Sequence, residues 1–311
     1  MQQLPLSVIH YGANDPEVTA GGVETFARNL RTIFQEVRFM TPARRNFDEV
    51  RRLQIPVICD NQNVRHWPKD IPLIGFQNGV AAVKARLVRT PGRLLMAWQQ
   101  KRAARRPKTI WVACAAWVGR TCGEIYGNPA HHTVYYFVDT ARFDGRLDNE
   151  GSKLILHDGR TAHKGKHLWP ILQKAFPQWR FEGLNCRPQD VPERMRKARA
   201  FIHLSRYEGN SLVCNEAMAM NLPCLFTKVG LMQDENRPHD VFVIEPEEAF
   251  GNADALVSRT REFLQSLDTR SYNPRAWSLA NASPEVAVNG WREAMKSFYA
   301  MSGWPPPSCV S

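Results

Sequence analysis

The sequence predicts an α/β protein with two doubly wound parallel sheets. Short apolar runs, which are typical of buried parallel strands, alternate with helical stretches along most of the 311 residues. This alternation favours parallel sheets with helices packed on them. The length suffices for two such domains, and a hydrophobic content of 43% with 23% charged residues is typical of ordered globular proteins.

The first domain is expected to span residues 1–148, with a polar linker at 144–152. Apolar residues recur at helical spacing between Val23 and Val37, which predicts one long helix there. The paired glycines Gly21 and Gly22 precede this helix and let backbone amides approach a ligand closely. Strands are expected at Leu6–His10, Val37–Met40, Ile55–Cys59, Leu73–Phe76, Thr109–Cys114 and Thr133–Phe137, with a further helix at Ala115–Tyr126.

The second domain is expected to span residues 149–284. Its strands are expected at Lys153–His157, Trp179–Glu182, Ala200–Leu204, 224–226 and Val241–Ile244, and its helices at Lys166–Phe176, Val191–Arg199, 212–220 and Asn252–Leu267. The remaining segment, 285–311, predicts a helix over Glu285–Tyr299. The tail Gly303–Ser311 contains three consecutive prolines and is expected to be loose.

The stretch 201–230 carries the clearest chemical pattern. Ser211 is suited to cap a helix that begins at Leu212, and the free amides and positive dipole end of such a helix can bind phosphate. Glu208 lies in the loop before this helix, and Glu216 lies on it. Carboxylates beside a phosphate site are expected when the ligand also carries hydroxyl donors, as a sugar nucleotide does. The alternative is an ordinary strand–helix–strand unit with solvated glutamates.

Glu208 and Glu216, within EGNSLVCNEAMAMNLP, resemble the E-x7-E motif of retaining glycosyltransferases of the GT4 family. The GGVE at 21–24 resembles the GGxE of this family, and Val138–Phe143 resembles the segment that ends its N-terminal domain. The resemblance covers most of the chain and implies the GT-B fold. In that fold two Rossmann-like domains face a central cleft, the N-terminal one on the acceptor side and the C-terminal one binding the nucleotide sugar. The last helix crosses back to the N-terminal domain.

Arg160 and Lys164 follow an expected strand, where an Arg and a Lys can hold a diphosphate. They resemble the Arg–Lys pair that does this in the family; the alternative is a basic pair in a surface loop. With Glu208, which the resemblance places on the transferred sugar, they form the expected catalytic set. Glu216 is expected to bind ribose hydroxyls. The other expected donor-binding residues are Gly209, Asn210, Ser211, Leu212, Gly21, Gly22 and Asn78, of which Asn78 stands where the family usually has a histidine.

The resemblance implies a same-face attack in which the leaving phosphate takes the acceptor proton. No metal site is expected, because the chain has no D-x-D pair and the two cations can serve instead. His157, His163 and His167 cluster in sequence without a metal-ligand spacing. No cofactor is expected; the substrate would be a nucleotide-diphosphate sugar with UDP or GDP.

The chain is basic, with a net charge of +11 and a pI of about 9.5, which suits an anionic partner. The range Ile71–Gly123 contains no Asp or Glu and ten Lys or Arg residues. Apolar side chains and Trp98 are interleaved with the basic residues of 84–108, as on helices that lie on an anionic membrane surface. A solvated basic helix and a nucleic-acid groove are the alternatives, and no helix-turn-helix, RNP or zinc-finger pattern supports the latter.

The seven cysteines are scattered and odd in number, which favours reduced thiols in a cytoplasmic protein. Neither a signal peptide nor an apolar run long enough to span a membrane is expected. A location on the inner face of the cell membrane would agree with the basic segment.

The function expected from these observations is retaining transfer of a sugar from a nucleotide-diphosphate sugar to a glycan or lipid-linked acceptor, in bacterial envelope polysaccharide synthesis. Two alternatives stay open: a sugar-nucleotide epimerase of the same fold, and a non-catalytic basic relative that binds nucleic acid or membrane.

Overall fold

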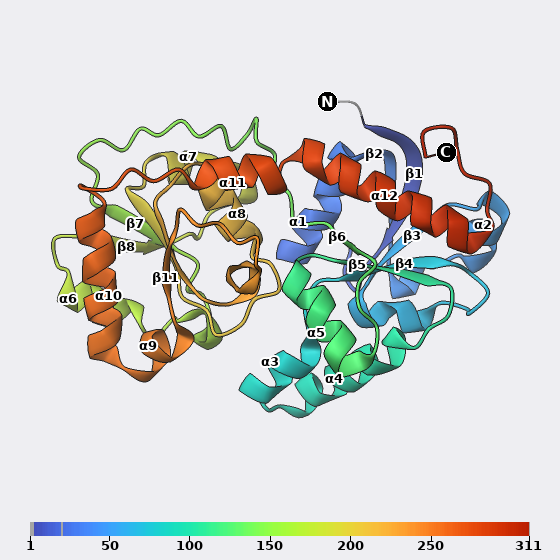
Figure 1. Cartoon of the computed structure of the whole chain (residues 1–311), viewed down its shortest axis with the longest axis horizontal. Coiled ribbons are helices and arrows are strands. Elements are labelled where there is room, and N and C mark those ends of the chain that lie inside the picture. The colour runs from blue at the N-terminus through green and yellow to red at the C-terminus, as the bar shows by residue number, and fades with distance from the viewer. Residues whose placement is uncertain (1–2, 20, 311) are drawn as a thin grey trace. The chain divides into compact units, whose positions relative to one another are not determined.

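The computed structural model describes residues 3–19 and 21–310, and the chain divides into two compact units (Figure 1). The amino-terminal unit comprises the residues up to Phe137 together with those from Pro284 onward, and the carboxy-terminal unit comprises Val138–Ser283. The division at Phe137 comes earlier in the chain than the boundary at 148/149 that the sequence suggests.

The amino-terminal unit is built on a six-stranded sheet with the order β2-β1-β3-β4-β5-β6, and its strand pairs are parallel. Its strands are β1 (Leu4–Tyr11), β2 (Phe34–Met40), β3 (Val57–Asp60), β4 (Leu73–Gln77), β5 (Thr109–Ala113) and β6 (His132–Thr133). The chain leaves β1 toward β2 on one side and returns to β3 on the other. The sheet therefore reverses its strand order at β1 and β3, where parallel α/β sheets form a crevice.

Six α-helices of the described residues lie in the amino-terminal unit. Five come before Phe137, and the sixth, α12, begins at Pro284. They are α1 (Gly22–Asn29), α2 (Phe47–Leu53), α3 (Ala81–Leu87), α4 (Pro91–Ala104), α5 (Ala116–Tyr126) and α12 (Pro284–Ser302), and they are accompanied by the 3-10 turns η1 (Leu30–Thr32), η2 (Pro42–Arg44) and η3 (Asn61–His66). Among the described residues, no helix is both long and apolar enough to cross a membrane.

The expectation of one helix from Val23 to Val37 is wrong. The helix α1 ends at Asn29, and Phe34 already begins β2. Phe34 and Val37 are buried, and a spacing of three residues fits a helix face as well as this strand. The segment forms a strand because it pairs with β1, where Val37 lies opposite Val8.

The strand expected at Thr133–Phe137 is also shorter than predicted. It is confined to His132–Thr133, because its neighbour β5 ends at Ala113, where the chain turns into α5. The apolar residues that follow, Val134, Tyr136 and Phe137, are buried without belonging to a strand.

The final helix α12 packs in the amino-terminal unit, as the expected return of the last helix requires. Its Trp291 is fully buried, with ring centroids 5.7 Å from Phe34 and 5.7 Å from Phe76. Phe76 in turn stacks on Phe26 of α1 at 4.5 Å. Chain ends far apart in sequence thus share one aromatic core.

The tail after α12 is not loose over its described part. Trp304 packs edge-on against Phe298, with ring centroids 5.6 Å apart, and joins the apolar cluster around Tyr11 and Trp67. Val310 is only 3% exposed. The prolines keep the tail out of a helix without keeping it off the protein surface.

The carboxy-terminal unit has a five-stranded parallel sheet with the order β11-β10-β9-β7-β8. Its strands are β7 (Leu154–His157), β8 (Arg180–Gly183), β9 (Ala200–His203), β10 (Cys224–Thr227) and β11 (Phe242–Ile244). Its helices are α6 (Trp169–Ala175), α7 (Val191–Arg196), α8 (Leu212–Ala219), α9 (Pro246–Gly251), α10 (Ala253–Ser266) and α11 (Pro274–Asn281), with the turns η4 (Ala162–Lys164), η5 (Pro188–Asp190) and η6 (Gly230–Gln233).

Candidate functional site

Three neighbouring strands of the carboxy-terminal sheet end side by side and bring their loops together. In sheet order these are β10, β9 and β7, and they pair through Phe226 with His203 and through Ile202 with His157. The residues that follow the three strands therefore meet at the carboxyl edge of the sheet, where ligands of parallel α/β sheets bind.

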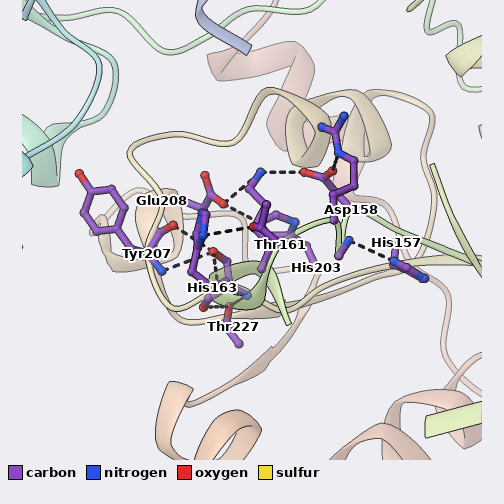
Figure 2. Close-up of polar contacts among 12 residues, drawn as sticks. His157, Asp158, Thr161, His163, His203, Tyr207, Glu208 and Thr227 are labelled. Carbon is purple, nitrogen blue, oxygen red and sulfur yellow. Dashed lines mark hydrogen bonds and ion pairs between the residues drawn. The ribbon is translucent and has the colours of Figure 1, made fainter. Parts of the chain in front are cut away.

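A chain of charged side chains joins two of these loops (Figure 2). Asp158, after β7, accepts from Arg160 Nε at 2.8 Å and from Lys164 Nζ at 2.7 Å. Lys164 Nζ also lies 3.4 Å from Glu208 Oε1, and the same oxygen lies 3.1 Å from His203 Nε2. The structure thus brings together the three residues of the expected catalytic set and adds Asp158 and His203 to them.

Asp158 determines where the two cations lie. Its side chain is 4% exposed, whereas that of Lys164 is 23% exposed and that of Arg160 is 64% exposed. A buried carboxylate that bonds two cations fixes their positions and leaves their other N–H groups toward solvent. Sequence reasoning missed this role of Asp158; the signal for it was an acidic residue between a strand end and an Arg–Lys pair.

Glu208 is held as a carboxylate. Burial by itself would raise its pKa, but the hydrogen bond with His203 and the charge of Lys164 outweigh burial and bring the pKa well below its usual range. Burial would lower the pKa of Lys164, yet the carboxylates of Glu208 and Asp158 raise it. The buried His203 pairs with Glu208 and has a raised pKa despite its burial, through the neighbouring Cys214 and Glu208. Glu208 is therefore ionised at neutral pH, and Lys164 and His203 beside it are positively charged.

The loop before Glu208 is fixed by backbone and hydroxyl contacts. Thr227 Oγ1 donates to the carbonyl of Ser205 at 2.7 Å and accepts from the Ser205 amide at 2.9 Å. On the far side, Gly230 has a φ of +59°, and a Cβ on it would lie 2.8 Å from Glu208 Cβ. A side chain at position 230 would push the Glu208 loop away, so glycine is needed there.

Gly159 is needed between Asp158 and Arg160 for a similar reason. A Cβ at this position would lie 1.6 Å from Trp169 Nε1. The Trp169 ring stacks on His157 with centroids 3.8 Å apart, and the Gly159 amide donates to His157 Nδ1 at 3.1 Å. Burial lowers the pKa of His157 to about 4, so this histidine is neutral and structural.

The helix α8 starts as the sequence predicts, with Ser211 at its N-cap, but the Ser211 side chain makes no capping hydrogen bond. In the described part of the chain, the amides of Leu212 and Val213 donate no hydrogen bond. Asn210, which is 5% exposed, accepts from Asn215 at 3.1 Å. Two free amides at the positive end of a helix, beside Glu208 and Gly209, are able to bind an anion.

Glu216 lies one turn into α8 and is half-buried. Burial raises its pKa to about 8, against the opposing charge of Arg142 and with the help of Asp158. Within the described residues its carboxyl group makes no hydrogen bond or ion pair. A carboxyl group with unused acceptor capacity can bind hydroxyl donors of a ligand.

The remaining expected residues lie in the amino-terminal unit. Gly21 is the N-cap of α1, where a Cβ would lie 2.2 Å from Glu24 Oε2, and a Cβ on Gly22 would meet nothing within 4 Å. Asn78 follows β4, and its amide donates to Asp60 at 2.8 Å and accepts from the Tyr136 hydroxyl. The side chain expected on the sugar is thus already fixed by two protein partners.

No group of three or more His, Cys, Asp or Glu residues is placed to hold a metal ion in the ranges 3–19 and 21–310.

Residues 182–273 match the family model of the glycosyl transferases group 1. This range contains β9, the Glu208 loop, α8 and β10. A search of curated proteins found no match.

Solved structures resemble nearly the whole chain. Sucrose-phosphate synthase from Thermosynechococcus elongatus has a TM-score of 0.73 at 13% identity, over 95% of this chain and 99% of that one. Anabaena HepE in complex with UDP and glucose has a TM-score of 0.65 at 16% identity, over 94% and 100%. The apo form of the lipopolysaccharide outer core galactosyltransferase WaaB has a TM-score of 0.60 at 12% identity, over 94% and 99%. The fold that was expected from the sequence, GT-B, is confirmed by these likenesses.

Proposed function

We propose how this glycosyltransferase acts. It has the GT-B fold, and its residues 182–273 match the group 1 glycosyl transferases. It transfers a sugar from a nucleotide-diphosphate sugar to a glycan or lipid-linked acceptor, and the anomeric configuration is retained. The observation that carries this proposal is the cluster in which Asp158 positions Arg160 and Lys164 beside Glu208.

The two cations suit the diphosphate of the donor. Charge develops on the leaving diphosphate as its bond to the sugar breaks, and fixed positive groups that already point there lower the barrier. The free amides of Leu212 and Val213 supply two more donors for phosphate oxygens. In this proposal no divalent ion is needed, because Arg160 and Lys164 carry the positive charge.

The carboxylates have separate roles. Glu208, kept ionised by His203 and Lys164, binds the transferred sugar and stabilises positive charge at its anomeric carbon. Glu216 binds the ribose hydroxyls. The acceptor oxygen forms its bond to the anomeric carbon on the face from which the diphosphate departs, and the acceptor proton passes to a phosphate oxygen. The nucleoside diphosphate then leaves, so the step needs no protein base.

The relatives favour a uridine donor and an envelope acceptor. The structure of HepE holds UDP and glucose, and WaaB is named as a lipopolysaccharide outer core galactosyltransferase. We therefore infer UDP ahead of GDP for this chain, and a role in envelope polysaccharide synthesis on the cytoplasmic side.

A membrane surface fits the basic segment of the amino-terminal unit. Five apolar side chains within and between α3 and α4 are exposed, by 38 to 58%: Leu87, Val88, Leu94, Leu95 and Trp98. Basic residues surround them, and Arg102 lies 4.8 Å from the Trp98 ring. One of the ten basic residues is structural, since Arg106 donates to backbone carbonyls of Pro68 and Ile71. An exposed apolar face within a basic field suits an anionic lipid surface.

Donor hydrolysis by the purified protein tests the proposal. UDP-, GDP- and ADP-sugars are incubated singly, with and without lipid extract as acceptor, and released nucleoside diphosphate is measured. We expect release from a UDP-sugar, reduced about a hundredfold or more by Glu208→Gln. The matched control is Glu182→Gln, a surface glutamate paired with Arg180 and Arg194, which should act as the wild type.

Absence of turnover with every donor, together with tight RNA or DNA binding, would contradict the transferase proposal. Conversion of a donor to an epimer without diphosphate release would point instead to an epimerase of the same fold.

A further inference from the structure

The helices α3 and α4 lie side by side in the amino-terminal unit and are attached to it by little apolar area (Figure 1). Ala85 is the buried residue of α3, and Gln100 and Ala103 are the buried residues of α4, although α4 is 14 residues long. Five apolar side chains within and between the two helices are exposed instead: Leu87, Val88, Leu94, Leu95 and Trp98. A helix pair with so few buried apolar contacts depends on polar contacts for its position.

Gln100 supplies these polar contacts. It is 4% exposed, and its Oε1 accepts from the Ala81 amide at 2.7 Å and from the Tyr126 hydroxyl at 3.0 Å. Its Nε2 donates to the carbonyl of Gly79 at 2.7 Å and to Asn61 Oδ1 at 3.4 Å. The side-chain amide thus uses both of its N–H groups and both acceptor positions. A buried amide with four partners fixes the elements from which these partners come.

Gln100 and Tyr126 also take the place of a cap at the start of α3. The N-cap residue Val80 provides no side-chain acceptor for the first amides of this helix. Gln100 accepts from the Ala81 amide, and the Tyr126 hydroxyl accepts from the Ala82 amide at 3.0 Å. Because unpaired amides at a helix start cost free energy, the start of α3 depends on these side chains of α4 and α5.

Residues 78–81, which we call the Asn78 segment, contain one of the expected donor-binding residues. The Asn78 amide donates to Asn61 Oδ1 at 2.9 Å, and Gln100 Nε2 contacts the same oxygen. Asn61 has a φ of +36°, a left-handed conformation that costs free energy for a residue with a side chain and is kept by surrounding contacts. Loss of the Gln100 side chain would therefore loosen the Asn61 turn and the Asn78 backbone together.

Gln100 and the exposed apolar side chains lie on different faces of α4. At about 100° per residue, Trp98 is about 160° from Gln100 around the helix axis. Leu94 and Leu95 are about 120° and 140° from Gln100 by the same measure. One face of α4 thus holds the Asn78 segment, and the other carries the apolar residues of the proposed lipid contact.

We propose that Gln100 is a positioning residue for the Asn78 segment, and that anionic lipid on the outer face of α4 acts through it. The helix has two arrangements, one seated with the Gln100 contacts made and one unseated with these contacts open. Lipid binds the seated arrangement better, because the apolar side chains of α4 share one face only while this segment is helical. Donor turnover rises with the seated fraction. The inference rests on the proposed function, both for the donor and for the lipid surface.

Donor hydrolysis with and without vesicles tests the inference on the full chain. UDP release from a UDP-sugar is measured with vesicles of phosphatidylcholine and phosphatidylglycerol, and with vesicles of phosphatidylcholine alone. We expect the anionic vesicles to raise wild-type turnover about fivefold, and phosphatidylcholine alone to change it by less than about twofold. Gln100→Met should bind UDP and anionic vesicles like the wild type, but its stimulation should fall below about twofold.

Two further variants separate positioning from a general loss of structure. Gln99→Met, at the neighbouring half-buried glutamine of the same helix, is the matched control and should keep the full stimulation. Tyr126→Phe removes the hydroxyl contacts with Gln100 and Ala82 but keeps the ring, and should give intermediate stimulation. Thermal melting checks that each variant is folded at the assay temperature. Partial unfolding would lower turnover with and without vesicles by the same factor, so the ratio of the two reports positioning.

Hydrogen exchange gives a second measurement that does not depend on turnover. Mass spectrometry of peptides that contain Ala81 and Ala82 should show exchange slowed about tenfold by anionic vesicles in the wild type, and unchanged in Gln100→Met. The inference is overturned if vesicle-bound wild type shows no slower exchange, or if folded Gln100→Met is stimulated as strongly as the wild type.

Failure of the inference can be told from failure of the proposed function. Absence of vesicle binding by the wild type overturns the inference together with the proposed lipid surface, and leaves the transferase function standing. Absence of turnover with every donor contradicts the transferase function instead. The exchange measurement then decides the inference by itself.

Discussion

Asp158 shows how one buried carboxylate can organise a site whose visible residues are cations. Its two oxygens bond Arg160 and Lys164, and through Lys164 it is linked to Glu208 and His203. Because Arg160 and Lys164 differ in exposure, their ion pairs with Asp158 contribute differently to the stability of the fold. Arg160 is a surface residue whose ion pair contributes little to stability, whereas Lys164 is largely enclosed between two carboxylates.

Replacing the two cations separately should distinguish binding from stability. Arg160→Ala should weaken UDP binding about tenfold and change the free energy of unfolding by less than about 1 kcal/mol. Lys164→Met should weaken UDP binding and also destabilise the fold by ~2 kcal/mol, because it removes the cation that two largely buried carboxylates share and leaves each with one partner, Arg160 or His203. Calorimetric titration with UDP measures the affinity, and urea unfolding measures the free energy of unfolding. Unchanged UDP affinity in a folded Arg160→Ala protein would contradict the diphosphate role.

The raised pKa of Glu216 predicts a pH dependence of nucleotide binding. With a pKa of about 8 the carboxyl group is mostly protonated at pH 7 and mostly ionised at pH 9. In the proposed ribose site the ionised form accepts hydrogen bonds from both hydroxyls, so UDP affinity should rise by up to about tenfold between these pH values. Glu216→Gln should bind UDP more weakly at pH 9 and show a flat profile. A wild-type affinity that falls or stays constant over this range would count against the ribose role.

The same shift has a consequence for stability. The folded protein holds the Glu216 proton more tightly than the unfolded chain, so the stability contributed by this group is present below the usual pKa of 4.5 and is lost as the pH rises through about 8. In the absence of nucleotide, the melting temperature of Glu216→Gln should therefore fall less between pH 6 and pH 9 than that of the wild type.

Sequence patterns identified the residues that stand in characteristic motifs and missed two residues whose side-chain contacts are visible only in the structure. Glu208, Arg160 and Lys164 stand in recognisable local sequences, and the fold brings them within one cluster. Asp158 and His203 were missed although their partners lie close to them in sequence. Asp158 bonds Arg160 and Lys164 of its own loop, and His203 contacts Glu208 in the loop that follows the same strand.

Among helices and strands, the positions of the elements were easier to predict than their lengths. The carboxy-terminal alternation of strands and helices could be located from apolar runs, whereas the boundary between α1 and β2 could not. Phe34 and Val37 fit both periodicities, and only pairing with β1 selects the strand. The helices α9 and α11 went unpredicted; both are short and begin at a proline.

The exposed apolar face of α4 predicts lipid binding. Replacing Leu94, Leu95 and Trp98 together by serine should weaken binding to vesicles of phosphatidylcholine and phosphatidylglycerol about tenfold or more. Both the wild type and the triple variant should bind only weakly to vesicles of phosphatidylcholine alone. Leu279→Ser on α11, where an apolar residue is also exposed but lies outside the basic segment, is the control. Sedimentation with vesicles measures the effect. Equal binding by the triple variant, or no preference for the anionic lipid, would remove the membrane role.

At the scale of the whole molecule, the amino-terminal unit is completed by the end of the chain. Trp291 of α12 is 0% exposed and packs among Phe26, Phe34 and Phe76. Sequence reasoning anticipated the return of this helix through the family resemblance. The aromatic contacts that hold it there join residues more than two hundred positions apart and could not be read from local patterns.

Removal of this contact should destabilise the amino-terminal unit. Trp291→Ala should cost ~3 to 5 kcal/mol of unfolding free energy, because it leaves a cavity between rings that do not collapse onto one another. Val286→Ala, an exposed position on the same helix, should change stability by less than about 0.5 kcal/mol. Urea unfolding followed by tryptophan fluorescence and circular dichroism compares them. Similar stabilities of the two variants would show that α12 contributes little to this unit.

The proposed retention of configuration is tested most directly by the configuration of the product. The product formed from an α-linked UDP-sugar is isolated before it can mutarotate, and its new linkage is assigned by proton NMR. The proposed mechanism predicts an α-linked product, because the acceptor attacks on the face that the diphosphate leaves, with support from Glu208, Arg160 and Lys164. A β-linked product would contradict it.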